Sequence, residues 1–245
     1  MDNKSIKILG VRIDKLNVEE AYNKFLSLFK QDSFSAIYTP NPEIIMVAQE
    51  DHELKDALLD ADLVIPDGIG VIYASRIHNL GLEERIPGIE FMERILKFCN
   101  NTNGSIFILG GKPGVAKKAC DKIQEKFPNI VMTGCHDGYF SDEDELKVVD
   151  KINEVKPDIL FVALGAPRQE KWIYSHRKIL NTKIAMGVGG SIDVWAGHAK
   201  RAPKLFIKLN LEWFYRLLRE PHRIGRMMSL PKFLIRVLLS RDVSK

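Results

Sequence analysis

The chain has 245 residues, of which 45% are hydrophobic and 28% charged, a composition typical of a globular protein and unlike a disordered or fibrous one. Its three cysteines form no CxxC pair and leave an odd one over, which disfavours a disulfide framework and a cysteine zinc site and suggests a reducing cytoplasm. The net charge of +4 is unevenly spread: residues 200–245 carry 12 basic and 3 acidic side chains, a net of +9, whereas residues 1–199 carry 24 and 29. We therefore expect an anionic partner for the C-terminal segment alone.

The first predicted element is a hairpin over residues 6–13, IKILGVRI. Beyond it, short apolar runs predict strands at 34–39, 62–66, 105–111, 129–134, 158–165 and 183–190. Amphipathic stretches between them predict helices at 17–30, 43–60, 69–78, 89–99, 113–126, 142–155 and 168–180, and Asn17 and Glu20 are spaced as a capping box for the first. This alternation predicts a Rossmann-like α/β fold, in which helices cover both faces of a mostly parallel sheet.

The strand pattern stops after residue 198. Pro203, Pro221 and Pro231 each suit the first turn of a new helix, so three short helices are expected. We therefore divide the chain into an α/β domain, residues 1–198, and a basic amphipathic helical appendage, residues 199–245. No apolar run reaches signal-peptide length or the roughly 18 residues of a membrane-spanning helix, so neither feature is expected.

Polar and glycine-rich segments follow the predicted strands: TPNPE at 39–43, PDGIG at 66–70, GGKPG at 110–114, GAPRQEKW at 165–172 and GVGGSIDVWAG at 187–197. Open α/β sheets bind ligands at the carboxyl ends of their strands, so these segments predict the site. The turn beginning at Gly110 could offer backbone N–H groups to a phosphate, but it is neither a GxGxxG nor a Walker loop. By itself it is better explained as a tight turn.

Asp67 comes directly after a predicted buried strand, fixed between Pro66 and Gly68. A carboxylate there could take a proton from a hydroxyl group, or it could merely close an Asx-turn, and the local sequence favours neither. Other polar residues of these loops are more often caps or surface groups when taken singly, but their convergence on one edge raises their joint odds of binding a ligand. They are Thr39, Asn41, Arg85 and Gln169.

No metal site is expected. DAD at 60–62 resembles a metal-binding DxD pair but precedes its strand, at the wrong edge of the sheet, and SDEDE at 141–145 suits a helix N-terminus. The six histidines lack metal-ligand spacing, and no serine lies in a GxSxG elbow. Metal-dependent and acyl-transfer chemistry are therefore disfavoured, and no cofactor is implied.

Read in order, TPNPEII, IPDGIGV, RIPG, LGAPRQEKW and GVGGSIDVWAGHAKRAP, followed by LEWFYRLLREPHR, resemble the WecG/TagA/CpsF glycosyltransferase family. The resemblance covers nearly the whole chain. Ile192 stands where many members carry Phe, a difference of packing more than of chemistry.

The resemblance implies transfer of N-acetylmannosamine from a UDP donor to the 4-hydroxyl of GlcNAc on an undecaprenyl diphosphate lipid, with inversion, in wall teichoic acid linkage-unit synthesis. Another UDP-sugar and another polyprenyl-diphosphate glycan are the alternative within the family. Asp67 matches the proposed general base. The matching substrate-binding positions are Thr39, Asn41, Arg85, Gly110, Gln169, Gly189, Arg216, Arg223 and Arg226.

A lipid acceptor also explains the appendage, which we expect to attach peripherally to the anionic inner face of the cell membrane. Its candidate membrane-contacting residues are Met227, Met228, Leu230, Phe233, Leu234, Val237 and Leu238. Self-association through the same apolar face is a further possibility. Three alternative interpretations remain. A nucleotide-binding oxidoreductase is disfavoured because this chain lacks the GxGxxG pattern, and a nucleic-acid-binding module is disfavoured because the appendage is too apolar. The third is that the appendage is purely structural, a basic amphipathic helix that only packs on its own sheet.

Overall fold

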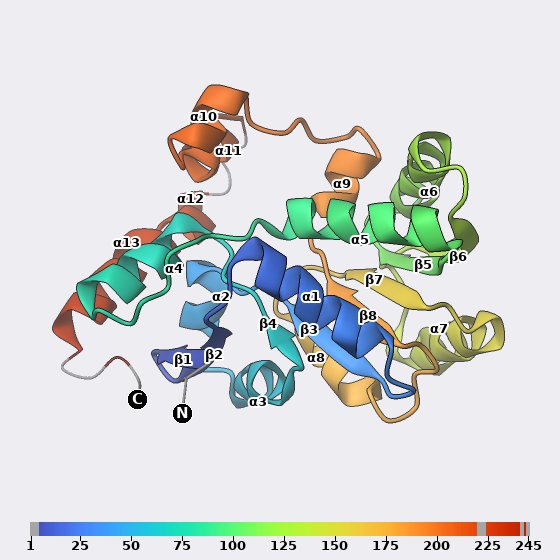
Figure 1. Ribbon diagram of the computed structural model, residues 1–245, viewed down its shortest axis with the longest axis horizontal. Coiled ribbons are helices and arrows are strands. Elements are labelled where there is room, and N and C mark those ends of the chain that lie inside the picture. Colours follow the sequence, from blue (N-terminus) through green and yellow to red (C-terminus); the bar gives the residue numbers. More distant parts are fainter. Residues whose placement is uncertain (1–4, 220–223, 241–242, 244–245) are drawn as a thin grey trace.

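The computed structural model describes residues 5–219, 224–240 and 243, without the side chains of Asp142, Arg216, Arg226 and Met227. Its centre is a six-stranded, wholly parallel sheet in the order β4-β3-β8-β7-β5-β6 (Figure 1). The strands are β3 (Ser35–Tyr38), β4 (Leu63–Val64), β5 (Ser105–Gly110), β6 (Val131–His136), β7 (Ile159–Ala163) and β8 (Ile184–Gly187). Each lies within or overlaps a predicted strand. The predicted hairpin is also present, as the antiparallel pair β1 (Ser5–Ile8) and β2 (Val11–Asp14).

Helices cover both faces of the sheet, as the alternating pattern predicts. The helices α1 (Val18–Phe29), α5 (Gly88–Thr102) and α6 (Val115–Lys126) pack on one face, and α7 (Asp142–Val155) and α8 (Arg168–His176) on the other. Successive strand residues alternate between the two cores: Ile106 and Ile108 join the first, and Phe107 and Leu109 the second. Both faces of the inner strands are thus apolar, which is why they read as continuous hydrophobic runs, whereas the edge strand β6 is partly exposed.

The predicted helix 43–60 is wrong as a single element, because the structure divides it into α2 (Pro42–Val47) and α3 (His52–Asp60). The Asp51 side chain accepts a hydrogen bond from the Leu54 backbone N–H at 3.0 Å and so begins a second helix. The helix predicted to reach residue 180 ends at His176, and α9 (Ser191–Trp195) was not predicted. The capping box of Asn17 and Glu20 is present, and α4 (Ile69–Ile77) agrees with its prediction.

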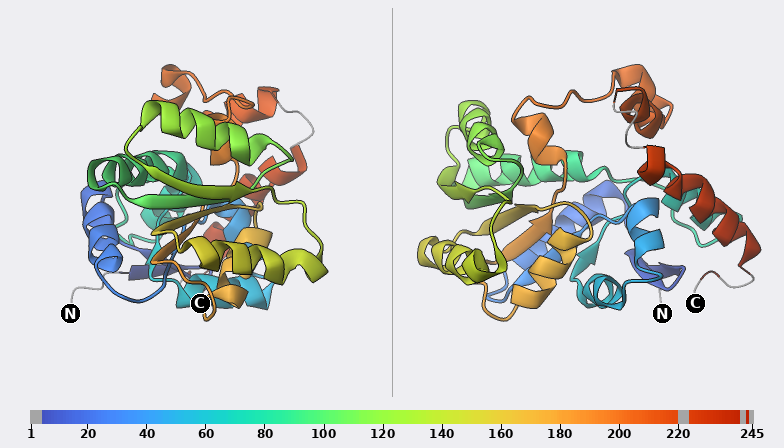
Figure 2. Two further views of the ribbon diagram at one scale, coloured as in Figure 1. Left: turned by 90° about the vertical axis from the view of Figure 1, so that its right-hand side faces the viewer. Right: turned by 180° about the vertical axis from the view of Figure 1, so that it is seen from behind.

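The C-terminal segment forms four helices in its described part, where three were expected. They are α10 (Lys204–Lys208), α11 (Glu212–Arg219), α12 (Ile224–Met227) and α13 (Ser229–Leu239). Pro203 precedes α10 and Pro231 lies in the first turn of α13, while Pro221 falls outside the described residues. Figures 1 and 2 show α10 and α11 standing away from the sheet, whereas α13 runs alongside α2 and α4.

The docking of α13 corrects the expected membrane surface. Phe233 and Val237 are fully buried in the core shared with α2 and α4, so neither can enter a membrane interface while α13 is docked. Their spacing of four residues, close to one helical turn, places them on one helical face, and the opposite face carries Ile235, Leu238 and Leu239, all more than half exposed. Within the described residues, no helix is long and apolar enough to cross a membrane.

Candidate active site

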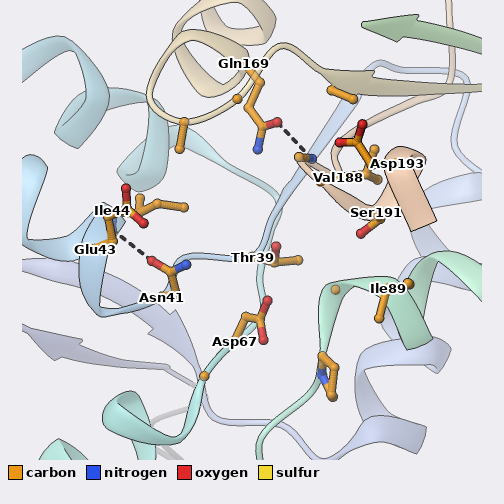
Figure 3. A pocket seen from close by; sticks show the side chains of 18 of the residues that line it. Thr39, Asn41, Glu43, Ile44, Asp67, Ile89, Gln169, Val188, Ser191 and Asp193 are labelled. Carbon is orange, nitrogen blue, oxygen red and sulfur yellow. Dashed lines mark hydrogen bonds between the residues drawn. The ribbon is translucent and has the colours of Figure 1, made fainter. Parts of the chain in front are cut away.

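A cavity of about 930 Å³ opens at the carboxyl edge of the sheet, within the size range of small-molecule sites (Figure 3). Loops that follow all six strands line it. They contribute Thr39 and Asn41 after β3, Asp67 after β4, Lys112 after β5, Tyr139 after β6, Gly165 after β7, and Gly189 and Ser191 after β8. The appendage closes one side with Asn210, Glu212, Trp213, Ser229 and Leu230.

Asp67 lies where the sequence predicts it, three residues beyond the end of β4 and at the cavity wall. Its backbone N–H donates to the Pro40 carbonyl at 3.2 Å, which ties the loop after β4 to the loop after β3. The next residue, Gly68, is the N-cap of α4 and has a φ of +89°, a conformation that disfavours any residue with a Cβ. This turn directs the carboxyl group of Asp67 into the cavity (Figure 3).

Thr39 and Asn41 lie near Asp67 in the wall of the same cavity (Figure 3). Asn41 is the N-cap of α2, and its side-chain oxygen accepts a hydrogen bond from the Ile44 backbone N–H at 3.0 Å. The capping role and a ligand-binding role are compatible here, because the cap occupies only the oxygen of the amide. The side-chain NH₂ group of Asn41 remains a donor on the cavity side (Figure 3).

Arg85 reaches the cavity from the loop between α4 and α5, where its guanidinium contacts the carboxylate of Glu212 in α11 at 2.6 Å. The two side chains are only 13% and 17% exposed, so solvent screens this pair less than a surface pair. A sheet-domain loop and the appendage are thus joined at the cavity itself. An anion arriving at Arg85 would meet a carboxylate already bound there.

Gln169, in the first turn of α8, is buried against the loop after β8. Its side-chain oxygen accepts a hydrogen bond from the Gly189 backbone N–H at 3.0 Å, and its side-chain nitrogen donates to Oε1 of Glu170 at 2.8 Å. Burial raises the pKa of the Glu170 carboxyl group to about 7, against the opposing effect of the Gln169 hydrogen bond. Sequence reasoning did not single out Glu170.

Of the two glycines among the predicted binding residues, Gly189 lines the cavity and Gly110 does not. A Cβ on Gly110 would lie 2.3 Å from the Ala163 carbonyl oxygen, and its φ is +132°, so this glycine lets β5 and β7 approach closely. The neighbouring Gly111 lines the cavity instead.

The three arginines expected from the appendage cannot be placed in the site. Arg223 lies outside the described residues, and the side chains of Arg216 and Arg226 are not described. Their roles therefore remain predictions. Other basic groups do line the cavity: Lys112, and Arg168, whose guanidinium stacks over the Phe140 ring at 4.9 Å.

Several lining residues were missed by sequence reasoning. Lys112, Ser191 and Asp193 lie in segments that the sequence marked as following strands, so their position was recognisable although their part in the site was not. Trp213 and Leu230 gave no such signal, because they reach the cavity only through the packing of distant segments. Across the described part of the chain, no group of three or more His, Cys, Asp or Glu side chains could hold a metal ion.

A parallel sheet with a ligand cavity at its carboxyl edge, lined by carboxylates, amides and basic side chains, defines the molecule as an α/β protein with an enzyme-type site. The chain belongs to the glycosyl transferase WecG/TagA/CpsF family, whose model matches residues 6–245. It is therefore a glycosyltransferase, as the resemblance of its motifs implied.

Curated relatives carry a more specific name. Over 204 residues the chain is 42% identical to the N-acetylglucosaminyldiphosphoundecaprenol N-acetyl-beta-D-mannosaminyltransferase of Bacillus subtilis (strain 168), covering 83% of this chain and 79% of the relative. Over 234 residues it is 38% identical to proteins of the same name from Staphylococcus aureus strains MRSA252 and MW2, covering 95% of this chain and 91% of each relative.

Proposed function

We propose that this protein transfers N-acetylmannosamine from UDP-N-acetylmannosamine to the 4-hydroxyl of GlcNAc on undecaprenyl diphosphate, with inversion at the anomeric carbon, in wall teichoic acid linkage-unit synthesis. The relatives' shared name supports the sugar and the acceptor. The observation that carries the chemistry is the carboxyl group of Asp67, which points into the cavity at the carboxyl edge of the sheet.

In the proposed reaction, Asp67 is the general base. It accepts the proton of the acceptor hydroxyl as that oxygen forms its bond to the anomeric carbon, and the bond from that carbon to the diphosphate oxygen breaks on the opposite face. UDP departs with the electron pair. A nucleoside diphosphate needs no proton to leave, so one carboxylate suffices.

Negative charge builds on the diphosphate as it departs, and the site must stabilise that charge. Arg85, Lys112 and Arg168 are the described cations at the cavity, and we assign Arg216, Arg223 and Arg226 to the same task. Arginine suits it because its planar fork binds phosphate oxygens through two hydrogen bonds. Donor contacts are assigned to Thr39, Asn41, Gln169 and the loop at Gly189, and Gly110 supports the neighbouring turn through its packing.

We further propose that the appendage holds the catalytic edge against an anionic membrane surface at the inner face of the cell membrane. Its exposed large apolar side chains are Leu205, Leu209, Phe214, Leu218, Ile224, Met228, Ile235, Leu238 and Leu239. Exposed basic residues accompany them: Lys204, Lys208, Arg219, Lys232 and Arg236. Each basic group near such a surface adds about 1 kcal/mol of attraction.

The donor is tested by supplying a panel of UDP-sugars together with a GlcNAc diphospholipid analogue. We expect mass spectrometry to find the disaccharide lipid with UDP-N-acetylmannosamine and little product with UDP-GlcNAc, UDP-N-acetylmannosaminuronic acid or UDP-glucose. NMR of the product should show the anomeric configuration opposite to that of the donor. Efficient use of another sugar would overturn the assigned donor, and a retained configuration would overturn the single-displacement chemistry.

A further inference from the structure

We propose that Glu170 is a positioning residue for donor binding: it fixes the side-chain amide of Gln169 so that an N–H group, and not the carbonyl oxygen, faces the cavity. The assignment of the donor rests on the proposed function. The orientation of the amide follows from contacts within the protein alone.

The amide of Gln169 is held at both ends. Its oxygen accepts from the Gly189 N–H at 3.0 Å, and its nitrogen donates to Oε1 of Glu170 at 2.8 Å. Turning the amide over would bring its NH₂ group against the Gly189 N–H and its oxygen against the Glu170 carboxyl group. The Gly189 contact would then be repulsive in any state, and the Glu170 contact would be repulsive whenever its carboxyl group is ionised, so the two neighbours select one orientation.

Glu170 acts from behind the wall of the site. Gln169 lines the cavity, whereas Glu170 does not and is only 1% exposed. An amide nitrogen has two N–H groups, of which one donates to Oε1 of Glu170 and the other is left to donate to a ligand. The cavity is thus offered a donor of fixed direction, suited to an oxygen acceptor on the UDP-sugar.

The backbone of β8 leaves room for this arrangement. A Cβ on Gly187 would lie 2.9 Å from the side-chain nitrogen of Gln169, which is closer than real Cβ atoms approach. Gly189, which donates to the other end of the amide, has a φ of +47°, in the left-handed region that glycine adopts without strain. Glycines therefore stand at both places where the amide meets β8 and the loop after it.

Glu170 is costly as a structural residue. Its second oxygen, Oε2, is buried without a hydrogen-bond partner, and burial raises the pKa of the carboxyl group to about 7. A buried carboxyl group with one unsatisfied oxygen destabilises a protein relative to a well-packed apolar side chain. Such a cost is common at functional sites, where a residue is retained for what it positions.

The other charged groups along α8 are occupied elsewhere. Tyr38 of β3 donates its hydroxyl hydrogen to the backbone carbonyl of Glu170 at 3.2 Å and not to its carboxyl group. Four pairs lie further along the helix and at its C-cap: Lys171 with Asp51 and with Glu53, Arg177 with Asp60, and His176 at 4.0 Å from Glu145. The Gln169 amide is thus the polar side chain that the structure shows bonded to Glu170.

The test compares the dissociation constants of UDP and of UDP-N-acetylmannosamine for wild-type protein and variants by calorimetry. Glu170→Ala should weaken binding of the UDP-sugar about five- to tenfold, the effect of one lost hydrogen bond, with kcat changed less than KM. Glu170→Gln keeps an acceptor oxygen for Gln169 and should restore binding to within about twofold of wild type. Ile173→Ala, a buried change on the same helix that leaves Gln169 untouched, should lower stability without changing the dissociation constant.

The double variant Gln169→Ala/Glu170→Ala decides the matter. It should bind the UDP-sugar no more weakly than Gln169→Ala alone, because Glu170 acts only through Gln169. Equal losses from Glu170→Ala in both backgrounds, or no loss in either, would overturn the inference. If wild-type protein binds no UDP ligand, the proposed donor class fails instead. The orientation is then tested by the side-chain NH₂ resonances of Gln169. In wild type these resonances should shift as pH rises through 7, and in Glu170→Gln they should not. Resonances that stay constant in wild type would overturn the inference.

Discussion

At the scale of single residues, the site depends on groups whose burial is unfavourable for folding. The carboxyl group of Glu170 is the clearest case, because burial raises its pKa from 4.5 to about 7 and leaves one oxygen without a partner. Between these two pH values the unfolded chain releases this proton and the folded protein keeps it. This group's contribution to stability is therefore fully present below pH 4.5 and is lost as pH rises through about 7.

Substituting Glu170 by Gln removes this titration. The free energy of unfolding of Glu170→Gln, relative to wild type, should rise between pH 5 and 7 and level off above that, for a total of about 2 to 3 kcal/mol. Urea unfolding of both proteins at pH 5, 6, 7 and 8 measures the difference. A difference that stays constant over this range would show that Glu170 has an ordinary pKa in the folded protein.

At the scale of elements, the contact between α11 and the loop before α5 joins the appendage to the site. Glu212 holds the guanidinium of Arg85 at 2.6 Å, at the cavity where we assign Arg85 to the donor diphosphate. A diphosphate and the Glu212 carboxylate would compete for the same donors. We therefore expect the ion pair to hold Arg85 until a bound diphosphate replaces the carboxylate.

The two partners should then respond to substitution in opposite directions. Arg85→Ala should weaken UDP binding about tenfold or more, whereas Glu212→Gln should strengthen it by several-fold, because the competing charge is gone. Calorimetric titration with UDP at constant ionic strength measures both. Weaker binding by Glu212→Gln would mean instead that Glu212 serves the site by holding α11 in place.

Local sequence determines most of these elements, but not those that depend on distant contacts. Most of the strands are recognisable because they are buried on both faces and thus mainly apolar, the edge strand β6 being the exception, and the polar loops after them locate Asp67 and Gln169. The break between α2 and α3 was missed because the N-cap of α3, Asp51, lies inside a stretch that was interpreted as one amphipathic helix. Trp213 and Leu230 reach the cavity through folding of the appendage onto the body, which no local pattern encodes.

At the scale of the whole molecule, the appendage combines a docked helix with exposed apolar surface. Phe233 and Val237 anchor α13 in the core, so its outward residues can be changed without undocking it. Removing the whole segment would expose that core and confound a binding experiment. Surface substitutions on α13 are the cleaner probe.

The triple variant Ile235→Gln, Leu238→Gln, Leu239→Gln should bind anionic phospholipid vesicles at least tenfold more weakly than wild type, since about 0.8 kcal/mol is lost for each methylene group withdrawn from the interface. Its thermal stability should change little, because these side chains are already in solvent. Vesicle sedimentation at low and high salt measures the effect. Unchanged binding that remains salt-sensitive would assign the attraction to the basic residues alone.

The central claim is that Asp67 is the general base of a glycosyl transfer in this cavity. The most direct test is Asp67→Asn, which preserves the shape of the side chain while removing its capacity to take a proton. Turnover with the donor and a GlcNAc diphospholipid analogue, measured alongside the donor dissociation constant, should fall about 100- to 10,000-fold while the dissociation constant stays within about twofold. Turnover close to that of wild type would contradict the claim.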